Sequence, residues 1–242
     1  MKKQKSSENP PKIPQNPYAV SLTESLDVIA RSSCMPYETA KGLFCAVGII
    51  GQIEGHVLSE STQKVTKYDQ LLPLLVRLEA DPRISGVLFL LNTLGGDVEA
   101  GLAIAEMIAT MKTPTVSLVL GGGHSIGIPL AVSADRSLIV PSATMTLHPV
   151  RTGGTVITAP QAFDYLIKMQ DRILDFISGH SNADREELHR RMMRTDQLAN
   201  DIGSVLDGEA AVACGLIDSI GGLADAMRAL EELTGTKEDG AF

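Results

Sequence analysis

The chain has 242 residues, of which 44% are hydrophobic and only 4% are aromatic. This length suits one sizeable domain, and the composition predicts a core of aliphatic side chains. The formal net charge of −8 argues against a general phosphate-binding surface and leaves room only for a local basic patch, and the scarcity of aromatic rings argues against a platform for single-stranded nucleic acid. We therefore expect no nucleic-acid partner.

The cysteines and the hydropathy pattern restrict the compartment. Cys34, Cys45 and Cys214 are widely spaced and form no CxxC or zinc-ligand pattern, so we expect neither a disulfide framework nor a metal site. No apolar run reaches the roughly 18 residues that a membrane span needs. The opening MKKQK is followed by polar, Pro-rich residues instead of the apolar segment of a signal peptide. Together these features predict a cytoplasmic protein without a membrane span.

The two ends of the chain are predicted to lack fixed structure. Four Pro residues among Lys, Ser, Asn and Gln predict a disordered arm, which we place at residues 1–20. The main domain is expected at 21–234, with 235–242 as a frayed tail. The stretch 18–41 is ambiguous and carries only a weak helical pattern.

Strands and helices alternate through the middle of the chain, which indicates an α/β fold built from parallel βαβ units. Apolar strands are predicted at 42–53, 86–92, 114–120, 137–140 and 144–150. Helices are predicted at 66–80, 95–111, about 126–134, 159–194 with a break near 179–182, and 222–233.

Two of the strand-to-helix junctions are glycine-rich, NTLGGD at 92–97 and LGGGHSIG at 120–127. Ligands collect where parallel strands end, and the first N–H groups of a helix have no intrahelical partner. Glycine also lets a substrate carbonyl come close to the backbone. The N–H groups of Gly95 or Gly96 and of Ile126 are therefore candidates for an oxyanion hole. The alternative interpretation is that these glycines only form tight turns.

The second junction contains Ser125 in GHSIG, which matches the G-x-S-x-G elbow of hydrolases. A serine needs a base to become nucleophilic. Of the five histidines, His148 fits best, because it ends an apolar strand and Pro149 restricts it to an extended backbone. His124 is expected to line the pocket, and the other three to lie in a loop or a solvated helix. On these residues alone, a turn serine and a structural histidine remain alternatives.

The ordered segments LLNTLGGDVEAGLAIAEMI, GGGHSIGIPLAVSADRSLIVPSATMTLHP and EAAVACGLIDSIGG resemble the ClpP-like serine peptidases of the Clp/crotonase fold. The resemblance covers about residues 45–230. It implies Clp/crotonase-like repeated ββα/βαβ units with a protruding helical handle at 159–190. It also implies Ser125 as the nucleophile, His148 as the base, and an oxyanion hole of Gly95, Gly96 and Ile126.

The resemblance places the acid of a Ser-His-Asp triad after the handle, close to an Arg. RTDQLANDIG supplies Arg194 with Asp196 and Asp201, and the order implies Asp196, with Asp201 as the alternative. The chain also departs from the family pattern. His124 replaces a small residue before the serine, and Thr93-Leu94 replaces Ser-Pro before Gly-Gly, so the substrate preference stays open.

These observations lead us to expect a serine endopeptidase that cleaves unfolded or small proteins without a metal or cofactor. The resemblance implies a homo-oligomeric ring and, as a partner, an ATP-dependent unfoldase, although the Pro-rich arm is unlike the family's short pore-lining N-terminus. The alternatives are an inactive scaffold of the same fold and a crotonase-type acyl-CoA enzyme. An α/β-hydrolase fits poorly, because its histidine follows the acid in the chain.

Overall fold

The structure is a computed structural model that describes residues 34–57, 59, 62–151, 160–196 and 202–238. The arm predicted at 1–20, the weak helical pattern before residue 34 and the last four residues of the tail lie outside the described residues.

The described strands form a nine-stranded, mostly parallel sheet. Its main path runs through β1 (Cys34–Thr39), β2 (Gly42–Glu54), β4 (Ile84–Gly96), β5 (Thr115–Gly123), β6 (Arg136–Ile139) and β9 (Ser219–Ile220). β1 is antiparallel to β2, and the other neighbours on this path are parallel. Three short strands lie beside the path: β3 (Val65–Lys67) next to β2, β7 (Thr144–Leu147) next to the end of β5, and β8 (Ser204–Asp207), antiparallel to β7.

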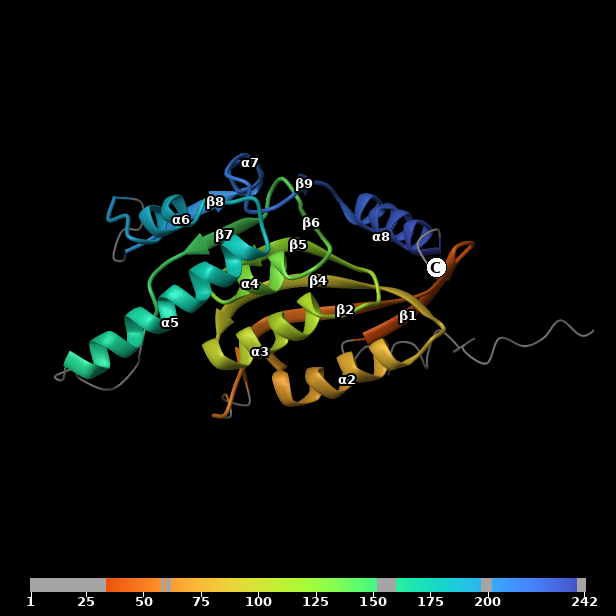
Figure 1. Ribbon diagram of the computed structural model, residues 1–242, viewed down its shortest axis with the longest axis horizontal. Coiled ribbons are helices and arrows are strands. Elements are labelled where there is room, and N and C mark those ends of the chain that lie inside the picture. Colours follow the sequence, from red (N-terminus) through yellow and green to blue (C-terminus); the bar gives the residue numbers. More distant parts are fainter. Residues whose placement is uncertain (1–33, 58, 60–61, 152–159, 197–201, 239–242) are drawn as a thin grey trace, which may run out of the picture.

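The described helices are α2 (Tyr68–Ala80), α3 (Val98–Ala109), α4 (Gly127–Val132), α5 (Pro160–Gly179), α6 (Arg185–Met192), α7 (Gly208–Ala213) and α8 (Leu223–Glu238). Figure 1 shows α2 and α3 on one face of the sheet and α8 on the other. Consecutive residues of β4 point to opposite faces of the sheet. Leu88 belongs to the same hydrophobic cluster as Leu230 of α8, whereas Phe89 belongs to the cluster that contains Ile104 of α3. This double cover explains why the central strands are apolar throughout.

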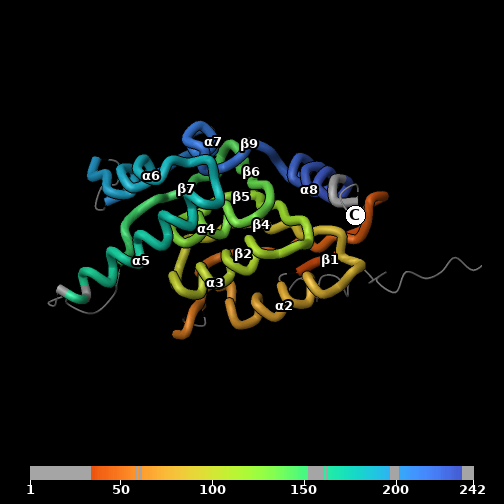
Figure 2. Tube along the Cα trace, in the orientation of Figure 1, coloured from red at the N-terminus to blue at the C-terminus, as the bar shows by residue number. Residues whose placement is uncertain are grey.

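The mostly parallel sheet with covering helices confirms the predicted α/β fold class, including the protruding handle. In Figures 1 and 2, α5 extends away from the sheet at one end of the molecule. Arg172 of α5 forms an ion pair with Glu99 of α3 at 2.7 Å. Arg185 binds both Asp171 and Asp175, so ion pairs fix the start of α6 against α5.

Three elements differ from the prediction in their boundaries. β1 lies in the stretch 18–41, which the sequence left ambiguous. Its Pro36 is unusual in a strand, and it is tolerated because β1 is at the edge of the sheet. The predicted strand 144–150 ends at Leu147, just before His148 and Pro149. α8 continues to Glu238, past the predicted end at 233.

Helix α3 packs closely against the second glycine-rich junction, and this contact requires Gly101. A Cβ on Gly101 would overlap Ile126 Cγ1 and lie 3.1 Å from Cγ2 of the same buried side chain. Overpacking of this kind costs about 1–3 kcal/mol, which exceeds the helix-propensity gain of about 1 kcal/mol from Gly to Ala.

We therefore expect Gly101→Ala to lower the free energy of unfolding, measured by denaturant titration at fixed protein concentration. Gly179→Ala is the matched control, since a Cβ at Gly179 meets nothing within 4 Å. Equal stability of the two variants would contradict the packing contact.

Candidate active site

Ser125 lies in a strained turn between β5 and α4. Its φ is +56°, in the left-handed region that residues other than glycine rarely adopt. The turn is held by backbone hydrogen bonds, since Ser125 N–H donates to the Thr146 carbonyl at 2.9 Å and Ile128 N–H donates to the Ser125 carbonyl at 2.9 Å. Such strain costs about 1–3 kcal/mol and is concentrated at functional sites, where the surrounding structure fixes it.

The end of β4 approaches this turn at Gly95. A Cβ on Gly95 would lie 2.7 Å from Ser125 Cβ and 2.8 Å from the His124 carbonyl oxygen, and the φ of Gly95 is +90°. Both the space and the backbone conformation therefore require glycine. The two glycine-rich junctions predicted from the sequence meet at this point.

The backbone N–H groups predicted to form the oxyanion hole differ in whether they already have a hydrogen-bond partner. Ile126 N–H has no hydrogen-bond partner among the described residues. Gly95 N–H donates to Thr93 Oγ1 at 3.1 Å, and the same hydroxyl donates to the Gly51 carbonyl at 2.6 Å. Gly96, with φ +152°, is exposed and lines the same cavity as Ser125. The N–H of Ile126 is thus available to a bound oxygen, whereas that of Gly95 is already used.

His148 follows β7 directly, at the edge of the sheet where Ser125 also lies. Its Nδ1 is 2.8 Å from the Pro149 carbonyl oxygen. A carbonyl only accepts hydrogen bonds, so in the neutral ring Nδ1 carries the hydrogen and Nε2 is the basic nitrogen. Within the described part of the chain, no hydrogen bond connects His148 with Ser125 or with Asp196.

Asp196 is separate from the other predicted catalytic residues. Arg194 donates two hydrogen bonds to its carboxylate, at 2.9 and 2.7 Å, and the Asp196 side chain is 66% exposed. These bonds hold the pKa of Asp196 below its ordinary value.

The segment after Asp196 returns to His148 at Gly203, since a Cβ on Gly203 would lie 2.9 Å from His148 Cβ. Asp201, two positions earlier in the sequence, lies outside the described residues.

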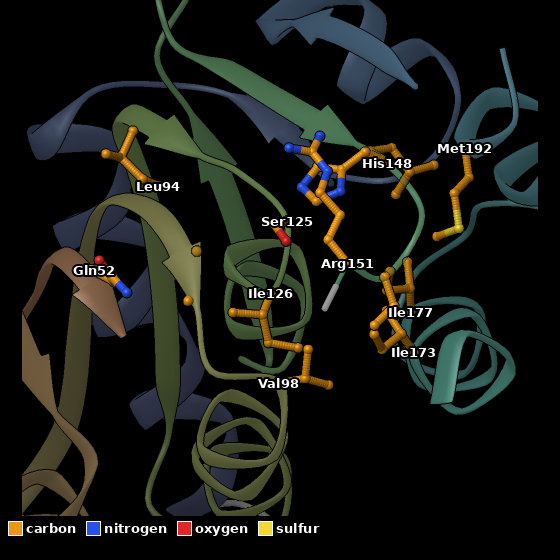
Figure 3. Close-up of a pocket in the computed structure, with 14 residues that line it drawn as sticks. Gln52, Leu94, Val98, Ser125, Ile126, His148, Arg151, Ile173, Ile177 and Met192 are labelled. Carbon is orange, nitrogen blue, oxygen red and sulfur yellow. The ribbon is translucent and has the colours of Figure 1, made fainter. Parts of the chain in front are cut away.

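A cavity of about 290 Å³ brings the remaining predicted residues together, and Ser125, His148, Gly95, Gly96 and Ile126 all line it. Figure 3 shows them with the other wall residues, which are mainly apolar. Those other residues are Gln52, Leu94, Val98, Leu147, Val150, Arg151, Ile173, Ile177 and Met192.

The sequence did not single out the wall formed by α5 and α6. Ile173 and Ile177 of α5 and Met192 of α6 are ordinary apolar positions of amphipathic helices, and only the tertiary structure turns them toward the cavity. Arg151 is the one arginine among the described lining residues. Its position three residues after His148 was the only feature of the sequence that could have placed it at the cavity.

His124 differs from expectation, because it is not among the described residues that line the cavity. Its Nδ1 is 2.8 Å from Thr146 Oγ1. Burial lowers the pKa of His124 below its ordinary value, and the nearby His148 lowers it further, which favours the neutral ring at pH 7.

Two further properties of the described residues bear on the type of site. They contain no group of three or more His, Cys, Asp or Glu side chains placed to hold a metal ion. None of the described helices combines the length and the apolar character needed to cross a membrane.

A strained serine at a strand-to-helix turn and a histidine thus line one cavity of an α/β scaffold. The family model described as Clp protease matches residues 47–223, so the chain belongs to the Clp protease family.

The chain is 52% identical to translocation-enhancing protein TepA of Halalkalibacterium halodurans over 187 residues, 77% of this chain and 73% of that protein. It is 25% identical to the ATP-dependent Clp protease proteolytic subunit of Lactococcus lactis subsp. cremoris, over 63% of this chain and 75% of that protein. It is 29% identical to the ATP-dependent Clp protease proteolytic subunit 1 of Chlamydia caviae, over 50% of this chain and 69% of that protein. The resemblance stated from the sequence motifs is confirmed.

The Thr93 hydroxyl links β2 to the Gly95 turn, which yields a prediction about stability. Thr93→Val removes the donor to the Gly51 carbonyl and the acceptor for Gly95 N–H at a site that is 1% exposed. Leaving such buried groups unpaired costs about 1–3 kcal/mol, so we expect a lower free energy of unfolding by denaturant titration.

Thr93→Ser is the control, because it keeps the hydroxyl and loses only a methyl group. A Val variant as stable as the Ser variant would show that these two hydrogen bonds do not support the turn.

Proposed function

We propose that this chain is a serine endopeptidase in which Ser125 is the nucleophile and His148 is the general base. The observation that carries the proposal is the pairing of a strained Ser125 with a His148 whose Nε2 is basic, on one cavity. Membership of the Clp protease family supports the same assignment.

In the proposed reaction, Ser125 Oγ attacks the carbonyl carbon of a peptide bond while His148 Nε2 takes the hydroxyl proton. The oxyanion that forms accepts hydrogen bonds from Ile126 N–H and from Gly96 N–H, or from Gly95 N–H if that group leaves Thr93 Oγ1. One well-placed donor is worth about 3–4 kcal/mol of barrier. The protonated His148 then gives its proton to the leaving amine, and water releases the acyl group from Ser125 by the same steps in reverse.

The triad requires one rearrangement of His148. Its Nδ1–H has to leave the Pro149 carbonyl and donate to a carboxylate, because a carboxylate stabilises the imidazolium that forms during attack more strongly than a neutral carbonyl does. Asp196 is the proposed acid and has to leave Arg194 to reach the ring. Asp201 is the alternative.

The substrate is proposed to be an unfolded or small polypeptide, and the mainly apolar walls of the cavity support apolar side chains at the cleaved bond. The relatives' names include proteolytic subunits of an ATP-dependent protease. We accordingly propose a homo-oligomeric ring in the cytoplasm. An ATP-dependent unfoldase is its candidate partner, and the Pro-rich N-terminal sequence is the argument against ordinary docking.

A second candidate function is a catalytically inactive scaffold of the same fold. It is favoured by one observation, that Ser125, His148 and Asp196 share no hydrogen bond within the described residues. The scaffold predicts that wild type neither cleaves protein nor reacts at Ser125.

Cleavage of casein and labelling by a fluorophosphonate, an active-serine reagent, separate the two functions. We expect wild type to cleave and to be labelled, Ser125→Ala to do neither, and His148→Ala to lose activity about 10³-fold or more. Ser142→Ala and His189→Ala are the surface controls and should behave like wild type. The mass of the assembly is measured on the same samples. Labelling of Ser125→Ala as strong as that of wild type would exclude this nucleophile.

The acid is tested by comparing Asp196→Asn with Asp201→Asn in the same assay. Loss of the triad carboxylate lowers kcat about 10⁴-fold, because the imidazolium loses its counter-charge, and the other substitution should have little effect. We expect the large loss in Asp196→Asn. A large loss confined to Asp201→Asn would assign the role to that residue instead.

A further inference from the structure

The His124 ring lies against Gly122, and in its present position it leaves no room for a side chain at that residue. A Cβ on Gly122 would lie 2.5 Å from His124 Nε2 and 2.6 Å from its Cδ2. The ring is half-buried there and is not among the described residues that line the cavity. The middle glycine of GGGHS therefore makes room for an imidazole, and the structure raises the question of what that imidazole does.

The partner of the ring is on the strand that leads to His148. His124 Nδ1 and Thr146 Oγ1 are 2.8 Å apart, and the Thr146 carbonyl also accepts the N–H of Ser125 at 2.9 Å. Thr146 is thus bound twice by two consecutive residues of the turn. Thr146 lies two residues before His148, and its side chain alternates along β7 with those of the buried Met145 and Leu147.

β7 is held in the fold by the buried side chains of Met145 and Leu147 and by its pairing with β8. It pairs with β5 at one residue pair, Gly122 with Thr144. The backbone hydrogen bond from Ser125 N–H to the Thr146 carbonyl is one link between the end of β7 and the serine turn. The bond between the two side chains supplies a second fixed point, two residues before His148.

We propose that His124 is a positioning residue for His148: seated on Gly122 and bonded to the Thr146 hydroxyl, it fixes the distance between β7 and the Ser125 turn. This inference rests on the proposed function, because the positioning concerns the base of that reaction. His124 itself does not touch the substrate. Since the neutral form of its ring is favoured at pH 7, it adds little positive charge beside the histidine that has to accept a proton.

The test uses the full-length protein and four single substitutions. Thr146→Val and His124→Ala remove the contact, whereas Thr146→Ser keeps the hydroxyl and His124→Asn keeps a polar atom near the position of Nδ1. We measure kcat and KM on a fluorogenic peptide, hydrogen exchange of the β7 backbone and the melting temperature, with His189→Ala as the histidine control.

We expect Thr146→Val and His124→Ala each to lower kcat about tenfold with KM within about twofold, because the base is misplaced while binding is kept. The double variant should be no slower than the slower single one, since both remove the same bond. Thr146→Ser and His124→Asn should stay within about threefold of wild type. Exchange of β7 should accelerate only in the Val and Ala variants.

Unchanged kcat and unchanged β7 exchange in the Val and Ala variants of an active enzyme would overturn the inference and leave the proposed function intact. Equal losses in the conservative variants would also overturn it, because the ring would then act by packing alone. If wild type shows neither turnover nor labelling, the proposed function fails. The exchange of β7 then still decides whether His124 fixes this strand.

Discussion

The close approach of Gly95 to Ser125 is the contact on which the site depends. Two neighbouring parallel strands, β4 and β5, end at the same edge of the sheet, and a side chain at Gly95 would collide with Ser125 Cβ and the His124 carbonyl. The approach is tolerated because Gly95 has a positive φ and no side chain. It brings the backbone of one junction to the hydroxyl of the other, which is the geometry needed to hold a carbonyl beside a nucleophile.

Contacts of Thr146 connect the serine turn with His148, the proposed base. Ser125 and His124 both bind Thr146, and the strand containing Thr146 ends at His148. The sheet thus connects serine and histidine through one short strand instead of through a direct bond. In the proposed function, β4 and β5 position the oxyanion donors, and β7 positions the proton acceptor His148.

The sequence predicts those residues of the cavity that directly follow apolar strands. Ser125, Ile126 and His148 each follow an apolar strand, and parallel strands bring such positions to one edge. Asp196 follows a helix, where the pattern gives no direction for the side chain, and Arg194 two positions away binds it in the structure. His124 could not be placed from the sequence, because the space at Gly122 depends on the tertiary path. In the fold, long apolar strands were predicted, whereas the two-residue β9 and the edge strand β1 carry too weak a pattern.

The hydrogen bond from His148 to the Pro149 carbonyl has a consequence for the proposed reaction. A neutral carbonyl can orient an imidazole but provides no counter-charge to an imidazolium. Under the proposed function, a chain in this state holds its base in the right tautomer yet cannot support acyl transfer efficiently. Under that function, the atom that accepts the Nδ1 hydrogen determines whether the imidazolium has a counter-charge.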